Sequence, residues 1–316
     1  MTPPGEISGD RATSGEIATR SGGPVTPANL ALLLVGLTVC FGQPLYGLAL
    51  FSLHSSLYSH ILLIPCISGY LVWIQWRTLP AASEPNRPLV SGLLASGTIL
   101  LGIYWAPRFA EVNLAREDSL ALLMLSYVAF FIGICGWFLG SAILRALAFP
   151  FGFLVFMAPF PVRLVEGIET FLQHASAGAA QMFFRLSGTT VFHHDLIFQL
   201  PGITLEVAPE CSGIHSSLAL FITSLVAGHF FLRKAWKSAL LSVAVIPLAI
   251  LRNGFRIFTI GELCVQVSPD MINHWIHRQG GPVFFALSLV PFFILLRILY
   301  KSDHPNAQAP TRPSQA

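Results

Sequence analysis

The sequence predicts an all-α polytopic membrane protein of about eight transmembrane helices, with a small extracytoplasmic helix-plus-hairpin cap between helices 5 and 6. Hydrophobic residues make up 54% of the 316 residues and charged residues only 10%, far from the averages of soluble proteins. The apolar residues are concentrated in runs that are long enough to cross a bilayer. The formal net charge of +3 is too small for a nucleic-acid surface, so we expect the lipid bilayer and other membrane proteins as partners.

Each predicted span is an apolar run near the roughly 20 helical residues that a hydrocarbon core requires. The runs that meet this requirement are 28–50, 58–79, 88–106, 119–139, 142–161, 212–232, 237–260 and 280–300. The weakest are 142–161, which contains three prolines, and 237–260, which contains two arginines. The polar ends, 1–27 and 303–316, are expected to be disordered cytoplasmic tails around a membrane domain of 28–302.

The lysines and arginines beside the spans predict the orientation. With both termini in the cytoplasm, eleven of these residues fall on the inner side and seven on the outer side, and all three lysines lie inside. The strongest local signal is Arg233-Lys234-x-x-Lys237 between two spans. We therefore expect a multi-pass membrane protein whose cap, residues 162–210, lies on the outer side.

The cap is predicted to contain one amphipathic helix and short strands. Apolar residues recur at helical spacing opposite polar ones, which is typical of a helix at the membrane interface. The apolar set is Leu164, Val165, Ile168, Phe171, Leu172 and Ala175, and the polar set is Glu166, Glu169 and Gln173. Strands are predicted at 189–192, 196–200 and 203–207, the last two joined by a Pro-Gly turn.

Cys211 lies in Glu210-Cys211-Ser212-Gly213, where a turn enters the sixth span. A thiol at a helix N-terminus lies in the positive field of the helix dipole, which lowers its pKa and favours the nucleophilic thiolate. Cys211 is therefore a candidate nucleophile. The alternative interpretation is a cysteine that packs at a helix start as a small apolar side chain.

Arg252 and Arg256 lie one helical turn apart on one face of the seventh span, with Asn253 between them. An arginine at membrane depth costs roughly 2.5–3.5 kcal/mol on insertion scales, so two of them need a water-filled cavity, a carboxylate partner or an interfacial position. This cost argues for a function. The alternative interpretation is that both side chains extend toward the nearby outer interface.

His274 and His277 lie just before the last span, and Gly280 and Gly281 follow them. Histidine is the side chain best suited to proton transfer near neutral pH, and two glycines allow a close backbone approach. An interfacial histidine beside Trp275 is the alternative interpretation.

The predicted topology brings these motifs to one side of the membrane. Cys211 begins the sixth span, the two arginines end the seventh, and His277 precedes the eighth, all at the outer face. A thiolate, a cation and an imidazole are the groups needed for covalent acyl transfer: one attacks, one stabilises the oxyanion or a substrate carboxylate, and one protonates the leaving amine.

The motifs also resemble one known family in order and spacing. Glu-Cys-Ser-Gly-Ile at 210–214, Arg-Asn-x-x-Arg-Ile at 252–257, and His277 followed by Gly281 and Phe285 resemble the exosortase/archaeosortase family. The likeness runs from about 188 to 285, with a weaker one at Ser59-His60. One departure is His215, which stands where arginine or a similar residue is expected.

The resemblance implies a membrane cysteine protease or transpeptidase that needs no cofactor or metal. It implies substrates that are membrane-anchored proteins with a C-terminal sorting signal: a Pro-Glu-Pro-type motif, one transmembrane helix and a basic end. Cleavage would pass through a thioester to water or another nucleophile, in connection with surface or exopolysaccharide biogenesis. The catalytic positions it implies are Cys211, Arg256 and His277; the supporting ones are Arg252, Asn253, Ser212, Gly213, Glu210, His215 and His274.

Two other functions are consistent with parts of the sequence. A zinc site of a membrane metalloprotease would draw on His193, His194, Asp195, Cys211, His215, His274 and His277, although the sequence has no His-Glu-x-x-His motif. A transporter or polysaccharide-assembly subunit would use the two arginines to line a pathway, although we find no internal repeat.

Overall fold

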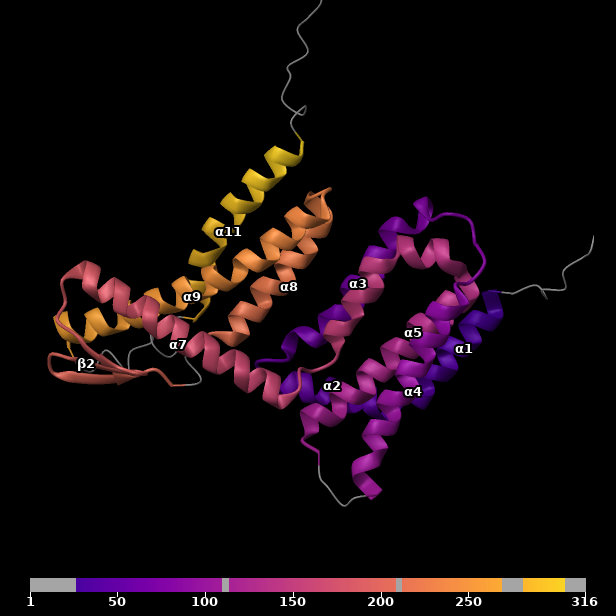
Figure 1. Cartoon of the computed structure of the whole chain (residues 1–316), viewed down its shortest axis with the longest axis horizontal. Helices are drawn as coiled ribbons and strands as arrows, with labels where there is room; N and C mark the ends of the chain where they lie inside the picture. The colour runs from indigo at the N-terminus through magenta and orange to yellow at the C-terminus, as the bar shows by residue number, and fades with distance from the viewer. Residues whose placement is uncertain (1–26, 110–113, 209–211, 269–280, 305–316) are drawn as a thin grey trace, which may run out of the picture.

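The computed structural model describes residues 27–109, 114–208, 212–268 and 281–304, and nearly all of them are helical (Figure 1). Within these ranges six helical segments are long and apolar enough to cross a membrane, and the number rises to eight if each of two bent helix pairs counts as one span. A single three-stranded sheet lies between the helices. The predicted fold class is confirmed.

The first part of the chain forms one group of packed helices. Its elements are α1 (Pro27–Cys40), α2 (Gly42–His54), η1 (Ser59–Leu62), α3 (Leu63–Gln75), η2 (Trp76–Thr78), α4 (Arg87–Phe109) and α5 (Arg116–Ala146). The α1 and α2 helices form a pair bent by 62° at Phe41, so the first predicted span is broken near its middle. The group is held by a cluster of buried residues that includes Ile61, Ile64 and Met124.

The fifth predicted span, 142–161, is present as short helical pieces. The α5 helix is interrupted at Gly140, whose φ of 83° is in the left-handed region that glycine adopts at low cost. The link between η2 and α4 enters this break: Ser83 Oγ accepts from Ala142 N, and Glu84 O accepts from Ser141 N. A β-carbon at Gly140 would overlap the Ser83 carbonyl. Two further short elements, α6 (Ala148–Phe153) and η3 (Leu154–Met157), then pack along α3.

The cap consists of α7 (Val162–Ser187) and a sheet of β1 (Phe192–His194), β2 (Ile197–Leu200) and β3 (Ile203–Glu206). The α7 helix is bent by 91° from the α6–η3 segment. The strands are antiparallel in the order β1-β2-β3. The last two match the sequence prediction, but the first strand begins at Phe192, the residue at which we expected it to end. A tight turn at Asp195, with φ of 57°, shifts the pairing toward the C-terminus.

The last part of the chain forms a three-helix group of α8 (Ile214–Phe231), α9 (Ala235–Gln266) and α11 (Gly281–Asp303). The α8–α9 turn is tied to the end of α11 by Lys237, whose Nζ lies 3.1 Å from Asp303 Oδ1. The same carboxylate accepts from the backbone N–H groups of Arg233 and Lys234. We call this the basic end of the group, and the opposite end, where α7 and the sheet lie, the cap end (Figure 1).

The last turns of the α9 helix reach into the core of the cap. Buried residues of α7, the sheet and the last turns of α9 form one cluster: Ala177, Ala180, Phe184, Phe198, Leu200, Leu205, Val207, Ile257, Ile260 and Cys264. From Ala235 to Arg252 the helix rises about 26 Å at 1.5 Å per residue. A hydrocarbon core of roughly 30 Å that began at Ala235 would therefore end near Arg252, while Ile257 and later residues pack inside the cap.

The predicted amphipathic pattern of α7 is wrong for Gln173. This residue, assigned to the polar face, is buried with an exposed fraction of 8%, as is its neighbour Leu172 of the apolar face at 5%. The exposed apolar stripe is narrower and contains Leu164, Ile168 and Phe171. The physical reason is that one side of α7 packs against α9 and the sheet, while another apolar side has no packed neighbour among the described residues. A helical pattern alone does not distinguish a protein neighbour from lipid.

Candidate active site at the cap end

The site begins at the turn through which the cap chain enters α8. Ser212 is buried and Gly213, the residue before α8, has φ of 74°. The Gly213 carbonyl accepts from Ser217 N at 3.0 Å, Ser217 Oγ at 2.7 Å and Ser216 Oγ at 3.1 Å. These bonds fix the orientation of the turn that immediately follows Cys211.

Arg252 of α9 is bonded to the same carbonyl. Its Nη2 donates to Gly213 O at 3.2 Å and lies 3.4 Å from Ser217 Oγ, and only 7% of the residue is exposed. Its Nη1 is buried and has no hydrogen-bond partner among the described residues. A buried guanidinium donor of this kind is suited to a carboxylate or a developing oxyanion.

The fit between the turn and α9 depends on the absence of a side chain at Gly213. A β-carbon there would lie 2.9 Å from Arg252 Nη2 and 3.3 Å from the Asn253 side chain. Asn253 is itself buried. Arg256 follows one helical turn later, half-buried, and its charge is close enough to repel that of Arg252. Two neighbouring, partly buried guanidinium groups favour the binding of an anionic group between or beside them.

Comparison with known proteins gives a family but no individual relative. The sequence profile described as transmembrane exosortase matches residues 51–294, which is most of the chain. The chain belongs to the transmembrane exosortase family. No curated protein and no solved structure matches it. Family membership implies a multi-pass membrane protein that processes substrate proteins bearing sorting signals, and members are generally cysteine transpeptidases.

The structure of this exosortase brings together four of the predicted supporting residues. Ser212, Gly213, Arg252 and Asn253 meet at the start of α8. Arg256 lies on the next turn of α9, and His215 is exposed on the first turn of α8. The remaining predicted residues lie outside the described residues: Glu210, Cys211, His274 and His277.

His60 was not among the predicted site residues. It lies in η1, and its imidazole is close enough to that of His215 for their charges to interact. Leu218, on the same face of α8 as His215, packs against the cluster that contains Ile61. His60 Nδ1 lies 3.0 Å from Leu57 O; a carbonyl only accepts, so Nδ1 carries the hydrogen and the neutral ring keeps its lone pair at Nε2. The only sequence signal was the weak family likeness at Ser59-His60.

Gln173 was placed on the wrong face of its helix, and its role in the site was therefore missed. Its side-chain nitrogen donates to Val207 O, directly after β3. This bond ties the chain that leads toward Cys211 to α7. Its neighbours Leu172 and Ser176 are buried as well, and the sequence alone offered no signal that this side of α7 faces protein.

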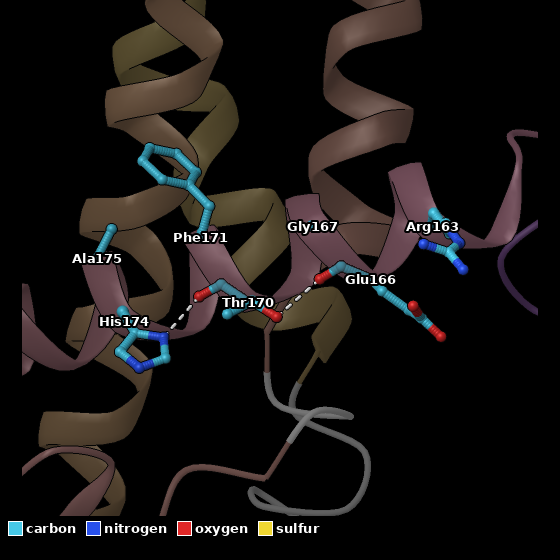
Figure 2. A pocket seen from close by; sticks show the side chains of 7 residues that line it. All are labelled: Arg163, Glu166, Gly167, Thr170, Phe171, His174 and Ala175. Atoms are coloured by element: carbon cyan, nitrogen blue, oxygen red, sulfur yellow. Dashed lines mark hydrogen bonds between the residues drawn. The ribbon is translucent and has the colours of Figure 1, made fainter.

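An open groove runs along the exposed side of α7 (Figure 2). Phe171 and Ala175 point to one side of the helix, and Glu166, Thr170 and His174 point to the other. Its lining among the described residues comes from α7 alone: Arg163, Glu166, Gly167, Thr170, Phe171, His174 and Ala175. His174 Nε2 also lies 3.1 Å from Asp195 Oδ1, which links α7 to the β1–β2 turn.

The residues of the zinc alternative that the structure describes do not form a cluster. No group of three or more histidine, cysteine, aspartate or glutamate side chains suited to a metal occurs among the described residues. His193 instead stacks on Phe198, with ring centroids 4.4 Å apart. Three residues of the zinc alternative, Cys211, His274 and His277, lie outside the described ranges.

Proposed function

We propose that this exosortase is a membrane cysteine protease or transpeptidase that cleaves C-terminal sorting signals of exported proteins through a thioester. The signal is a Pro-Glu-Pro-type motif followed by one transmembrane helix and a basic end. Cys211 is the nucleophile, Arg256 the cation, and His277 the acid and base. This activity serves surface or exopolysaccharide biogenesis.

The observation that carries this proposal is the bond between Arg252 and the Gly213 carbonyl. It connects the arginine turn of α9 with the turn that follows Cys211, across 39 residues of sequence. The contact lies near the membrane boundary, where a sorting signal passes from its motif into its own helix. A structural role alone would not require a buried guanidinium with an unused Nη1.

In the first half-reaction the Cys211 thiolate attacks the scissile carbonyl carbon and the carbonyl π electrons move to oxygen. Arg256 stabilises that oxyanion. The C–N bond then breaks as His277 gives a proton to the leaving amine, which leaves a thioester on Cys211. In the second half-reaction water or another nucleophile gives its proton to His277 and attacks the thioester, and the thiolate leaves.

Arg252 holds the turn after Cys211, supported by Asn253 and Ser212. Such positioning has a large effect on rate, because a misplacement of about 1 Å costs about a hundredfold in activity. Gly213 is required because no side chain fits between the turn and α9. Glu210, His215 and His274 are further supporting residues of the proposed site.

The site is proposed to face the periplasm, in a bacterial inner membrane. The basic end, with Arg233, Lys234 and Lys237, then lies in the cytoplasm as the positive-inside rule requires. Two of the exposed tryptophans, Trp76 and Trp236, directly precede the basic residues Arg77 and Lys237, as expected for an interfacial aromatic belt.

The experiment follows a reporter protein that carries the Pro-Glu-Pro-type motif, a transmembrane helix and a basic end. Its intact mass is measured from cells with wild-type protein, Cys211→Ala, Cys211→Ser, or the control Cys40→Ala, whose side chain is exposed on α1. We expect processing with the wild type and the control, and none with either Cys211 variant. A reporter processed normally by Cys211→Ala would exclude the thiol mechanism. An intact reporter in all strains would favour the transporter or polysaccharide-assembly alternative.

A further inference from the structure

The strand that leads to Cys211 lies at an edge of the cap sheet. The strand order is β1-β2-β3, so β3 is paired on one side only. Its last residue, Glu206, precedes Cys211 by five residues, or at most about 17 Å of extended chain. An edge strand presents a row of unpaired backbone groups that can pair with another chain.

The register shows which groups of β3 point outward. Val207 N donates to Leu196 O at 2.9 Å, so Leu196 and Val207 form a hydrogen-bonded pair. Along an antiparallel ladder, hydrogen-bonded pairs alternate with non-hydrogen-bonded pairs. Leu205 is therefore bonded to β2, while Thr204 and Glu206 direct their N–H and C=O groups to the open edge. Both side chains are exposed. Within the described part of the chain, these outward groups meet no hydrogen-bond partner.

We propose that this open edge binds the substrate, which adds the extended segment of its sorting signal to β3 as a parallel fourth strand. The inference rests on the proposed function and names the recognition step of the same site. Strand addition obtains affinity from main-chain hydrogen bonds and specificity from alternate side chains.

The direction of the added strand follows from the topology. β3 runs toward Cys211 and then into α8, which crosses the membrane. A sorting signal likewise runs from its motif into a transmembrane helix. A substrate parallel to β3 therefore brings the residues after its motif toward Cys211 and its helix into the bilayer beside α8. An antiparallel strand would lead the substrate helix away from the membrane.

The parallel arrangement also explains how a motif with two prolines is accepted. In a parallel pair one residue of the added strand donates to one carbonyl and accepts from the N–H two residues later. Here the middle residue donates to Thr204 O and accepts from Glu206 N. Its two neighbours turn their nitrogens away from the sheet, and that is where an edge strand tolerates proline. A Pro-x-Pro segment thus fits when its middle residue lies opposite Leu205, and does not fit when one of its prolines lies there.

The same register selects the side chain between the prolines. The middle residue lies opposite Leu205, and the side chains of directly opposed residues lie on the same face of the sheet. Leu205 is buried in the cluster that contains Ile257 of α9. Arg256 directly precedes Ile257 on that helix. A glutamate in the middle position therefore lies on the face toward the helix that carries Arg256, and this favours an acidic residue there.

The first experiment removes one outward donor and leaves the β2–β3 ladder intact. Glu206→Pro removes the N–H that the substrate needs; Glu206→Ala removes only the side chain; Thr204→Pro alters the same strand but keeps the carbonyl that the substrate needs. The half-time of reporter processing is measured by pulse-chase at matched protein levels. We expect a loss of about three- to tenfold for Glu206→Pro, in keeping with one backbone hydrogen bond, and about twofold or less for the two controls.

Equal rates for Glu206→Pro and wild type would overturn the proposal, as would a loss in Thr204→Pro larger than that in Glu206→Pro. Failure of the proposed function is a different result, since it requires normal processing by Cys211→Ala.

A second experiment tests docking without chemistry. In the Cys211→Ala background, a cysteine is placed at Thr204 or, as the matched control, at Phe192, which is exposed on the opposite edge strand. The reporter carries a cysteine directly before its Pro-Glu-Pro motif. A short bismaleimide should cross-link the reporter to Thr204→Cys at least fivefold more than to Phe192→Cys. Equal cross-linking at the two positions, or none at Thr204→Cys, would exclude docking at this edge.

Discussion

Replacing Gly213 by alanine should disable the exosortase far more than its effect on stability explains. A non-glycine residue in the left-handed region costs roughly 1–2 kcal/mol. The added β-carbon would also lie 2.9 Å from Arg252 Nη2. Arg252 then has to leave the Gly213 carbonyl, and a hydrogen bond from a charged group contributes about 1.5–3 kcal/mol. If that bond positions the turn after Cys211, the processing rate should fall about ten- to hundredfold.

A second glycine provides the matched control. Gly188 has φ of 78° at the end of α7, close to the 74° of Gly213, but a β-carbon there would meet no atom within 4 Å. Gly188→Ala therefore bears the same backbone cost without displacing a neighbour. The assay is the processing half-time of the reporter, normalised to the amount of folded protein, together with the thermal midpoint of each purified variant. Gly188→Ala should process within about twofold of wild type at about 1 kcal/mol lower stability.

A third variant separates backbone strain from steric displacement. Asparagine enters the left-handed region at lower cost than alanine but still has a β-carbon. Gly213→Asn should therefore be as inactive as Gly213→Ala if Arg252 is displaced. The reasoning is refuted if Gly213→Asn recovers activity, or if Gly213→Ala and Gly188→Ala process the reporter at the same normalised rate.

Three further predictions concern the arginines, the histidines and the orientation. Arg256→Lys should be nearly as inactive as Arg256→Ala, because lysine lacks the planar two-donor geometry that grips a carboxylate or oxyanion; near-normal processing by the lysine variant would contradict this role. His277→Ala should lose cleavage at every pH while still allowing alkylation of the nucleophilic thiol, and His274→Ala should retain most cleavage; cleavage by both variants would remove histidine from the mechanism. A membrane-impermeant thiol reagent should label a cysteine at Thr190 from outside but not one at Ala235, and the reverse pattern would invert the topology.

The transmembrane architecture was predicted from the sequence because few backbone structures are stable in lipid. Each backbone polar group must be satisfied within its own segment, so a long apolar run has to be a helix. The break inside the first predicted span, at Phe41, was not predicted. The break at Gly140 lies between the predicted spans 119–139 and 142–161, but the sequence did not show that Ser83 and Glu84, far away along the chain, enter it. Hydropathy does not register such a contact.

The cap was predicted in outline for a different reason. The Pro-Gly turn at 201–202 fixes the β2–β3 hairpin locally, and the last two strands lie where the alternation placed them. The first strand shifted because its pairing depends on the turn at Asp195. Gln173 was assigned to solvent although it is buried and bonded to Val207 O, since periodicity gives the faces of a helix but not what lies against each of them.

The sequence by itself determined that this protein is a membrane-embedded exosortase, because apolar composition, charge bias and the spacing of three short motifs are all local properties of the chain. It also determined that Arg252 needed a special environment, because a buried arginine is costly wherever it lies. Only the tertiary structure decided what that environment is. The Gly213 carbonyl lies 39 residues away along the chain, and Nη2 reaches it because α8 and α9 pack closely where a glycine leaves room. The open edge of β3 was likewise decided in three dimensions, since a strand's free side is set by which neighbours the folded chain provides.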